Sequence, residues 1–539
     1  MKFSDHARVV LVEPLLGART SPSAGSELAD EGARAPRRIG VLLAWRCALA
    51  LVLPAAASAA IQAGFAERDI TPQIGQERPG GYGKAFHRQL LDPCKVRAAV
   101  FADGTKTVAL VGLDALMIDR KVVQEARTEI ARVTKIPAAA VMIAASHSHS
   151  SGPTGMVQPG QYDQAGVEIR QLAYEQSSAA DPAYLKHVTA QIVAAVAAAS
   201  AAVVPAQLGF GNGREDKVGF NRRVRMKNGQ TWTNPGVGNP DNVAPAGPID
   251  PDVGVIGAWD LEGRLLGSIV NFACHTNVIP DGISANWVYH LERTIQGAFY
   301  SKAPVVYLAG ACGDISKIDP FARFERPSEA RWMEIVGGRV GAEAVKVLLA
   351  AERGADVPLD VRTKVWTIDR RAPSAANVER ARAIIAAGKK PGVPAQTAWT
   401  FAKETLMTDF LVRTQRAVEV EVQAIQVGPA VYVSNPAEYF VEYGLEIKQR
   451  SPFPFTFPVE LANGCVGYVP TEEAFSAAGG GYETRLTSYS NLDIRAGRQF
   501  AEAGIELASG LKPGPVPQPP PLRKPGEPWL FGNVPPQVD

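Results

Sequence analysis

The chain has few cysteines and almost no surplus of either charge. Only five of its 539 residues are cysteine, and none has the close Cys-Cys spacing that structural zinc sites use. The formal net charge is +2 and the arginines are scattered, so the sequence lacks the basic surface that binds nucleic acid. We therefore expect no nucleic-acid partner.

Long apolar runs are also missing. The most apolar stretch, between Arg38 and Ala59, is interrupted by Arg46 and falls short of the roughly 20 residues needed to cross a membrane. Its basic start and its Ala57-Ser58-Ala59 end are instead typical of a secretory signal. We expect a leader over residues 1–59 with a signal peptide at about 37–59, no transmembrane segment in the mature chain, and a secreted or periplasmic protein.

Removal of this leader would leave a neutral protein with four cysteines. It would take away seven of the 56 Lys and Arg and five of the 54 Asp and Glu, which leaves equal numbers. In an oxidising compartment four thiols allow three complete pairings, and the sequence does not choose among them. Because three of the four lie within a few residues of the motifs below, we expect them to pack or bridge around a pocket. The four are Cys94, Cys274, Cys312 and Cys465.

What the sequence does contain is the pattern of an α/β protein. Apolar residues make up 46% and charged residues 20%, as in soluble globular proteins, and the length allows a large core. Strand-like and helix-like segments alternate along residues 60–511. Strands are predicted over 95–101, 106–117, 207–213, 253–260, 265–273, 304–309, 417–427 and 430–433. Helices are predicted over 121–133, 181–203 (capped by Asp181), 290–300, 328–352 and 375–387.

Two further segments are set apart by composition. Residues 228–251 are rich in Gly, Pro and Asn and are predicted to be a polar loop. Residues 512–539 are rich in proline and are predicted to be an extended, polyproline-like tail, either wrapped on the body or free.

Four apolar runs far apart in the sequence end in a group suited to metal binding or proton transfer. The first reaches His147 and His149, whose rings would share a face if the strand continued. The others reach His275, Glu438 and Tyr468. Each has a simpler interpretation on its own: a surface histidine pair, a core histidine, a carboxylate at a helix N-terminus, and a half-buried aromatic side chain.

With these pieces in this order, residues 63–510 resemble the neutral ceramidase family, which are zinc-dependent amidases. Several short motifs in the right order are more specific than one. The matching pieces are Ala63-Gly-Phe-Ala-Glu-Arg-Asp-Ile-Thr, Ser146-His-Ser-His-Ser, Asn221-Arg222, Asn271-Phe-Ala-Cys-His275, Gly313-Asp-Ile-Ser316, Pro436-Ala-Glu438-Tyr-Phe-Val-Glu-Tyr-Gly444, and Tyr468-Val-Pro-Thr-Glu-Glu followed by Tyr482-Glu.

The resemblance implies a single zinc ion per chain, held by four side chains. His147 and His275 would be the imidazole ligands, Glu438 the carboxylate ligand and Tyr468 a phenolic ligand; Glu442, one helical turn later, competes with Glu438 for that role. Zinc accepts this mixture of nitrogen and oxygen donors and keeps a position open for water when it is catalytic. It lowers the pKa of that water to about 7, which generates hydroxide at neutral pH.

The remaining family positions would handle protons and charge. His149 would orient the nucleophile or protonate the leaving nitrogen, and Arg222 and Tyr482 would donate to the developing oxyanion. Ser316 is either a nucleophile or a positioning hydroxyl. Since zinc would already supply a nucleophile, we favour the supporting role for Ser316.

The chain also departs from the family. Lys317-Ile318 stands where the family has Pro-Asn, Ser284-Ala285-Asn286 stands where the family reaches an acidic residue, and residues 154–176 form an insertion. We expect a sandwich-like α/β catalytic domain without the family's C-terminal immunoglobulin-like domain. The expected substrate is ceramide or another N-acylated amphiphile. The alternatives are the same zinc chemistry on a different linear amide or ester, and a secreted binding protein without catalysis.

Overall fold

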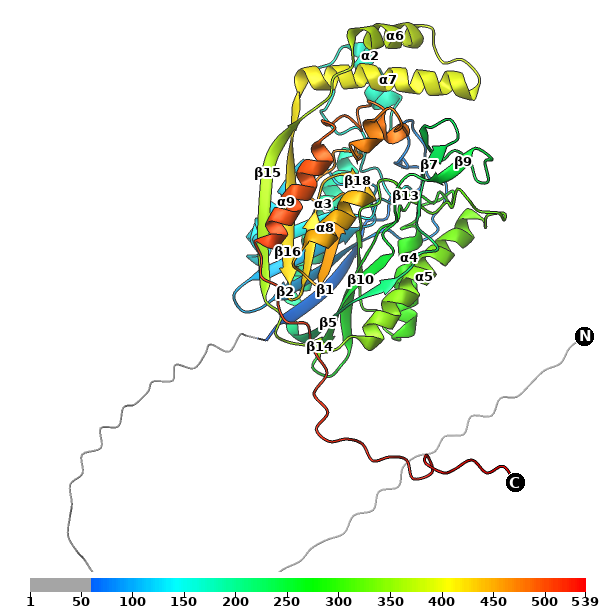
Figure 1. Cartoon of the computed structure of the whole chain (residues 1–539). Coiled ribbons are helices and arrows are strands. Elements are labelled where there is room, and N and C mark those ends of the chain that lie inside the picture. The colour runs from blue at the N-terminus through cyan, green and yellow to red at the C-terminus, as the bar shows by residue number, and fades with distance from the viewer. Residues whose placement is uncertain (1–59) are drawn as a thin grey trace, which may run out of the picture. The chain divides into compact units, whose positions relative to one another are not determined.

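Two β-sheets form the centre of the computed structural model, which describes residues 60–539 (Figure 1). The larger has nine strands in the order β12-β11-β10-β5-β1-β2-β3-β4, with β14 paired to β5. Its strands are β1 (Gln62–Asp69), β2 (Lys95–Ala102), β3 (Thr107–Leu113), β4 (Val141–Ala145), β5 (Val204–Arg214), β10 (Asp252–Asp260), β11 (Leu265–Phe272), β12 (Val305–Ala309) and β14 (Arg353–Gly354). Within this sheet β3 and β4 are parallel, as are β11 and β12.

The second sheet has four strands in the order β15-β16-β17-β19. They are β15 (Leu359–Asp369), β16 (Ala417–Val427), β17 (Ala430–Ser434) and β19 (Phe455–Val459). The two sheets share one hydrophobic core, in which Ile256 and Ile269 of the larger sheet meet Tyr432 and Phe457 of the smaller. The close approach depends on Gly254, where a Cβ atom would lie only 2.2 Å from the Phe457 ring.

Helices cover the outer faces of both sheets (Figure 1). The pair α1 (Arg120–Thr134) and α3 (Pro182–Ala201) packs on β1 and β2, and the pair α4 (Trp287–Ala298) and α5 (Glu329–Ala350) packs beside β5, β10 and β12. The smaller sheet is covered by α8 (Val441–Arg450) and α9 (Ala496–Ser509). The predicted mixed α/β, sandwich-like class is therefore confirmed for this part of the chain.

A smaller core lies apart from the sheets. It joins α2 (Val167–Arg170) and the following π-helical turn η2 (Gln171–Glu175), both in the predicted insertion, to α6 (Ala375–Ala386) and α7 (Val393–Thr414). Trp399 and Leu406 of α7 are buried in it. In Figure 1 α2, α6 and α7 lie together at the end of the molecule opposite β14.

Short elements complete the structure around the ends of the strands. The two-residue strands β6 (Phe220–Asn221) and β13 (Ile315–Ser316) pair with each other, as do β18 (Glu438–Tyr439) and β20 (Tyr468–Val469). A three-stranded sheet is formed by β7 (Arg223–Met226), β8 (Thr231–Thr233) and β9 (Asn242–Pro245). The single-turn helices are η1 (Ala138–Ala140), η3 (Glu473–Phe475) and η4 (Tyr482–Thr484).

Most predicted elements lie within a few residues of their expected bounds. The Asp181 carboxylate accepts a hydrogen bond from the Tyr184 backbone N–H and caps α3 as predicted. The prediction of a plain loop over 228–251 is wrong in part, because β8 and β9 both pair with β7 there. Helices α7 and α9 were not predicted. The expected signal peptide lies outside the described residues.

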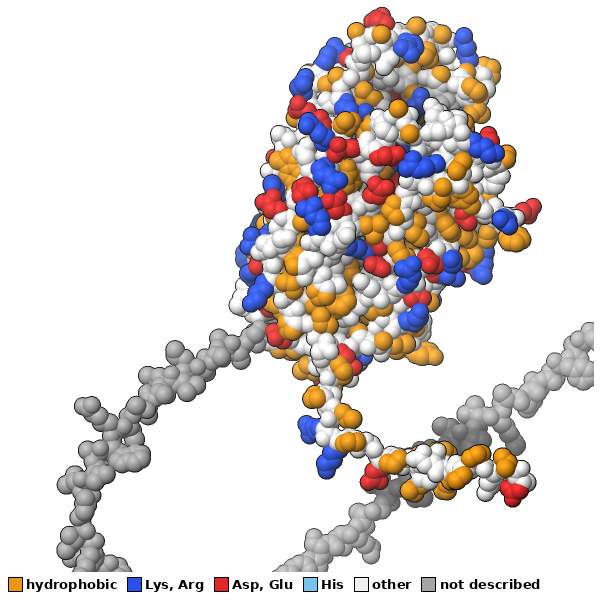
Figure 2. All heavy atoms as spheres, in the orientation of Figure 1, with side chains coloured by type: hydrophobic (Ala, Val, Ile, Leu, Met, Phe, Trp, Pro, Cys, Tyr) orange, Lys and Arg blue, Asp and Glu red, His pale blue; other side chains and the backbone are white. Residues whose placement is uncertain are grey.

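The surface and the cysteines bear on the other sequence-based predictions. Basic and acidic side chains are interspersed over the face seen in Figure 2, with no broad area of one sign. Among residues 60–539 no helix has both the length and the apolar character that membrane crossing requires. All four cysteines in this range are free thiols, so they pack around the core rather than bridge it. The first residues of the proline-rich segment contact the body, where Lys512 O accepts a hydrogen bond from Gln426.

Candidate metal centre

Two histidine-bearing loops meet where three strands of the larger sheet end. His147 follows β4, and His275 follows β11. The backbone after β19 joins the ends of β4 and β12, because Leu461 O accepts from Ala145 N while Glu460 N donates to Ala309 O. This bridge brings distant parts of the chain to one place.

The strand argument for the histidine pair is wrong, although the two rings do meet. Strand β4 ends at Ala145, and His147 has a left-handed backbone with φ of 66°. A tight turn therefore replaces the expected strand alternation. It still brings the rings of His147 and His149 to a centroid distance of 4.7 Å, with their planes almost perpendicular.

Three side chains from different segments converge on one point. The Glu438 Oε2 atom lies 3.1 Å from Nε2 of His147 and 3.1 Å from Nε2 of His275. His149 Nε2 lies 3.2 Å from His147 Nε2, and the three histidines form a cluster whose ligand atoms all lie within 4.8 Å of one another. His147, His275 and Glu438 are each only 1% exposed.

The second nitrogen of each ring is held by the backbone. His147 Nδ1 donates to the Leu116 carbonyl at 2.9 Å, and His275 Nδ1 donates to the Cys312 carbonyl at 2.6 Å. This tautomer leaves the Nε2 lone pairs aimed at the shared point, as in histidines that bind metals. Four ligands at about 2.0–2.1 Å from a tetrahedral zinc ion would be separated by about 3.3 Å. The spacing of the nitrogen and oxygen atoms therefore fits a metal ion of this size.

Burial and charge set the protonation of the cluster. Burial and the Arg222 charge lower the pKa of His275 to about 4, so its imidazole is neutral and can act as a ligand at neutral pH. Burial also favours neutral His147, but the Glu438 carboxylate outweighs it and raises the pKa of that ring. Burial, together with the neighbouring His147 and His275, holds the pKa of His149 well below its usual range. His149 is thus held in its neutral form.

Tyr468 reaches the cluster through strand pairing. It lies directly opposite Glu438 in the parallel pair β18–β20, so both side chains reach the histidine cluster from this pair of strands. Its hydroxyl accepts a hydrogen bond from the Tyr482 hydroxyl. Burial and Glu438 raise the pKa of Tyr468 well above its usual range, so only a strong positive charge nearby would turn this phenol into an anionic ligand.

Arg222 and Tyr482 lie beside the histidines, and a buried acid holds the arginine in place. Arg222 Nε donates to Glu483 Oε1 at 2.9 Å, and one Nη donates to the Gly313 carbonyl at 2.7 Å. The other Nη lies 3.4 Å from His275 Nε2. The guanidinium group therefore faces the point where the metal ligands meet, with Tyr482 next to it. Glu483 follows Tyr482 in a matching motif, but no sequence pattern indicated that it pairs with Arg222.

Ser316 and Glu442 are placed differently. Within residues 60–539 the Ser316 hydroxyl bonds only to the Ile318 backbone N–H, at 3.3 Å, and not to an imidazole that could activate it. Glu442 is exposed, and its Oε1 would lie 3.2 Å from a Cβ at Gly247. The structure thus brings together seven of the eight predicted site residues and leaves Ser316 outside their hydrogen-bonded group.

A glycine-rich loop that contains Gly80 and Tyr82 covers the candidate site. No sequence pattern connected this loop with the site. The opening above the cluster has a volume of about 40 Å³ and is lined by Gly80 and Tyr82 as well as by His147 and His149. Lys403 of α7 donates to the Tyr82 carbonyl at 2.5 Å and so ties this loop to the smaller core. The loop's glycines were visible in the sequence, but nothing there indicated what they cover.

Replacing Gly80 with alanine is expected to displace His149 and, for the zinc-dependent amide hydrolysis that the family resemblance implies, to lower kcat by about 10²-fold without loss of metal. A Cβ at Gly80 would lie 2.3 Å from His149 Nδ1, and its φ of +97° strains any other residue. Misplacing a proton-transfer group typically costs 10²–10⁴-fold in rate. Gly83→Ala is the control, because a Cβ there meets nothing within 4 Å. Kinetics with metal analysis measures the effect; unchanged kcat in Gly80→Ala would contradict it.

The fold and the site together define an α/β protein with a buried cluster of three imidazoles and a carboxylate that could hold a metal ion. Two solved structures share this fold. The neutral ceramidase from Pseudomonas aeruginosa superimposes with a TM-score of 0.62 at 18% identity, over 86% of this chain and 77% of that one. A ceramidase complexed with C2 gives a TM-score of 0.61 at 17% identity, over 85% and 77% of the two chains.

The resemblance to neutral ceramidases predicted from the sequence is therefore confirmed at the level of the fold. No family model matches the chain, and no curated protein sequence matches it.

Proposed function

We propose that this chain is a zinc-dependent amidohydrolase that cleaves the N-acyl amide bond of ceramide or a related N-acylated amphiphile. The observation that carries the proposal is the convergence of His147, His275 and Glu438 on one point, with each Nε2 atom 3.1 Å from the same carboxylate oxygen. The shared fold with ceramidases of solved structure supports the choice of an amide substrate.

The donor set favours zinc. Two imidazoles, a carboxylate and a phenol combine nitrogen and oxygen ligands, and a fifth side chain, His149, lies beside them with its Nε2 3.2 Å from that of His147. When bound, zinc would supply an activated water molecule and polarise the scissile carbonyl. Tyr468 completes the ligand set in this proposal, since it pairs with Glu438 across β18 and β20.

The surrounding side chains would do the rest of the chemistry. His149, half-buried and 3.2 Å from His147, is the group we assign to move the proton of the attacking water to the leaving nitrogen. Arg222 and Tyr482 donate to the oxygen on which charge develops. Ser316 holds the neighbouring loop through its bond to Ile318 and does not attack. We also propose export, because residues 37–59 have the pattern of a signal peptide.

An alternative proposal keeps the same zinc chemistry on another linear amide or ester. It is favoured by the departures at Lys317-Ile318 and at residues 154–176, which alter the surroundings of the site more than the site itself. A binding protein without catalysis is the third possibility. It predicts bound zinc without turnover of any N-acyl substrate.

Removing the metal is expected to abolish turnover of a fluorogenic N-acyl amide, and adding zinc should restore it. Metal analysis should find one zinc per chain before chelation. Ser316→Ala should keep its activity within about tenfold, since the variant loses one modest hydrogen bond. The decisive comparison is activity after complete demetallation. Activity that persists there, and disappears in Ser316→Ala, would assign the nucleophile to Ser316 and overturn the zinc proposal.

A further inference from the structure

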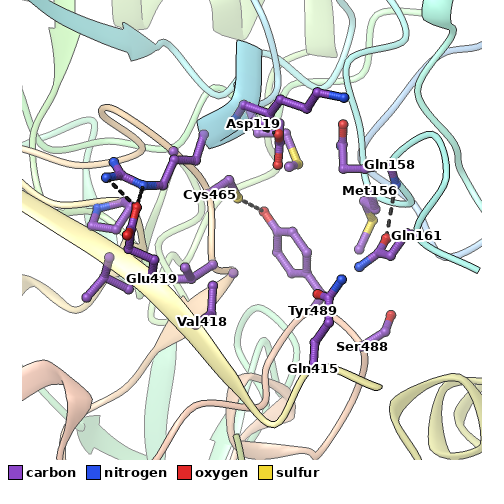
Figure 3. Close-up of a pocket in the computed structure, with 18 of the residues that line it drawn as sticks. Asp119, Met156, Gln158, Gln161, Gln415, Val418, Glu419, Cys465, Ser488 and Tyr489 are labelled. Carbon is purple, nitrogen blue, oxygen red and sulfur yellow. Dashed lines mark hydrogen bonds and ion pairs between the residues drawn. The ribbon is translucent and has the colours of Figure 1, made fainter. Parts of the chain in front are cut away.

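A second, larger cavity adjoins the candidate metal centre (Figure 3). Its volume is about 530 Å³, and it shares Met156 and Tyr489 with the opening above the histidines. Tyr489 forms the wall between the two spaces. Its ring packs edge-on against Tyr468 at a centroid distance of 5.9 Å, and its hydroxyl points to Cys465. A substrate bound at the metal centre could therefore extend past Tyr489 into the cavity.

The lining of this cavity is polar. Four glutamine side chains face it, together with charged groups from α1 and β16. Three of these glutamine and acidic groups, Gln158, Gln161 and Glu419, can be followed in Figure 3. A bare alkyl chain would leave such groups without partners, so the cavity suits a polar part of a substrate.

Most of the charges in the cavity neutralise one another. Arg120 forms ion pairs with Glu419 and with Glu421, each at 2.8 Å, and Arg127 joins Glu421 from behind at 2.9 Å. The Asp119 carboxylate accepts from the Lys121 backbone N–H and caps α1. These groups form a balanced network that offers no strong attraction for a ligand of either sign.

Arg370 is the exception among the partly buried charges of the cavity, whereas Lys121, which also lines it without an ion pair among residues 60–539, is exposed. Arg370 lines the cavity and is partly buried, yet no carboxylate in the same range lies at ion-pair distance from it. Its Nη1 donates to the Asn491 amide oxygen at 2.6 Å, and its Nε is buried without a partner. Burial lowers its pKa, but a guanidinium group remains charged in proteins. A partly buried cation without a counter-ion is costly to keep, and a bound anion would offset that cost.

We propose that this cavity binds an anionic group of the substrate and that Arg370 is the residue that pairs with it. The inference rests on the proposed amidohydrolase function and narrows its substrate class to N-acyl compounds carrying a carboxylate, sulfonate or phosphate. Arginine suits such a group because its planar fork can make two parallel hydrogen bonds. Since Tyr489 separates the cavity from the metal centre, a spacer must join the anion to the scissile amide.

The experiment compares matched amides with the full-length zinc-loaded protein. N-dodecanoyl conjugates of glycine, 4-aminobutanoate and 6-aminohexanoate vary the spacer, the taurine conjugate replaces carboxylate by sulfonate, and the 6-aminohexanol conjugate is neutral. Mono-amides of dodecanedioic acid place the carboxylate on the acyl half instead. We expect kcat/KM to favour one anionic series over the neutral amide, with an optimum spacer length.

Arg370→Gln should lower the ratio of kcat/KM for the anionic amide to that for the neutral amide by roughly 10–100-fold, the usual value of a charge-assisted pair. Arg370→Lys should restore part of the ratio. Arg371→Gln is the matched control. Arg371 is also partly buried and bonds to the Leu492 and Ser490 carbonyls, but it does not line the cavity. That variant should keep the wild-type ratio.

Two outcomes would overturn the inference. One is equal kcat/KM for anionic and neutral amides, and the other is an equal ratio in wild-type protein and Arg370→Gln. If no amide is turned over, the proposed function fails, and the cavity is then tested by calorimetric titration with N-dodecanoyl-6-aminohexanoate and the 6-aminohexanol conjugate. Preference for the anion that disappears in Arg370→Gln would uphold the anion site alone; equal binding would reject it.

Discussion

Glu438→Gln is expected to lose bound zinc and to lower kcat/KM by about 10³-fold or more. The amide keeps the shape of the side chain but removes the charge that lies 3.1 Å from both His147 Nε2 and His275 Nε2. A metal ion contributes several kcal/mol to transition-state stabilisation, and about 4 kcal/mol corresponds to a 10³-fold change in rate. Zinc content by mass spectrometry and kinetics with a fluorogenic amide measure both effects.

Glu442→Gln is the matched control, because Glu442 was the competing carboxylate in the sequence. Its side chain lies near Gly247 rather than at the histidines, so zinc and activity should be retained. Zinc loss in Glu442→Gln, with zinc kept in Glu438→Gln, would reverse the assignment.

The zinc affinity of the wild-type protein is expected to decrease as the pH is lowered. His147, whose pKa is raised by Glu438, must lose its proton before it can bind a metal.

The parts of the fold that follow a simple period could be predicted from the sequence. Strands β10 and β11 are apolar runs joined by a turn at Leu261-Glu-Gly, and α3 begins at a capping aspartate followed by proline. Helix α7 gave no such signal, because Lys403, Glu404 and Thr408 are buried inside it. Lys403 donates to the Tyr82 carbonyl and the Ser177 hydroxyl, Glu404 accepts from the Ser488 hydroxyl, and Thr408 donates to the Glu404 carbonyl. These polar positions break the apolar period.

Sequence motifs pointed to residues that the structure places together, but not to how the fold brings them there. The resemblance placed Glu438 and Tyr468 together, yet only the pairing of β18 with β20 explains why they meet. The turn at His147 depends on a left-handed backbone that histidine seldom adopts, so no propensity argument predicts it. Glu483 and Arg370 contact partners more than a hundred residues away in the sequence, and Gly80 lies against His149 from a separate loop. Single-sequence patterns carry no information on such contacts.

Arg222→Gln is expected to lower both stability and activity, for two separable reasons. Its partner Glu483 has a side chain that is 0% exposed, and the variant would leave that carboxylate without its cation. Breaking a buried ion pair in this way costs roughly 3–5 kcal/mol in free energy of unfolding. Loss of an oxyanion donor costs a further 10²–10³-fold in kcat. Thermal or denaturant unfolding measures the first effect, and steady-state kinetics measures the second.

The double variant Arg222→Gln/Glu483→Gln separates the two effects. Two neutral amides can bond to each other and to Thr233, whose hydroxyl donates to Glu483 at 2.5 Å in the wild-type protein. Most of the lost stability should therefore return, while kcat should stay 10²–10³-fold below wild type. Arg222 lies 3.4 Å from His275 Nε2, so the substitution could also disturb the metal ligand. Zinc content is therefore measured in parallel, and an unchanged value excludes metal loss as the cause of the lower kcat. Recovery of kcat together with stability would show that Arg222 only supports the fold, and the charge on the reacting oxygen would then rest on Tyr482 alone.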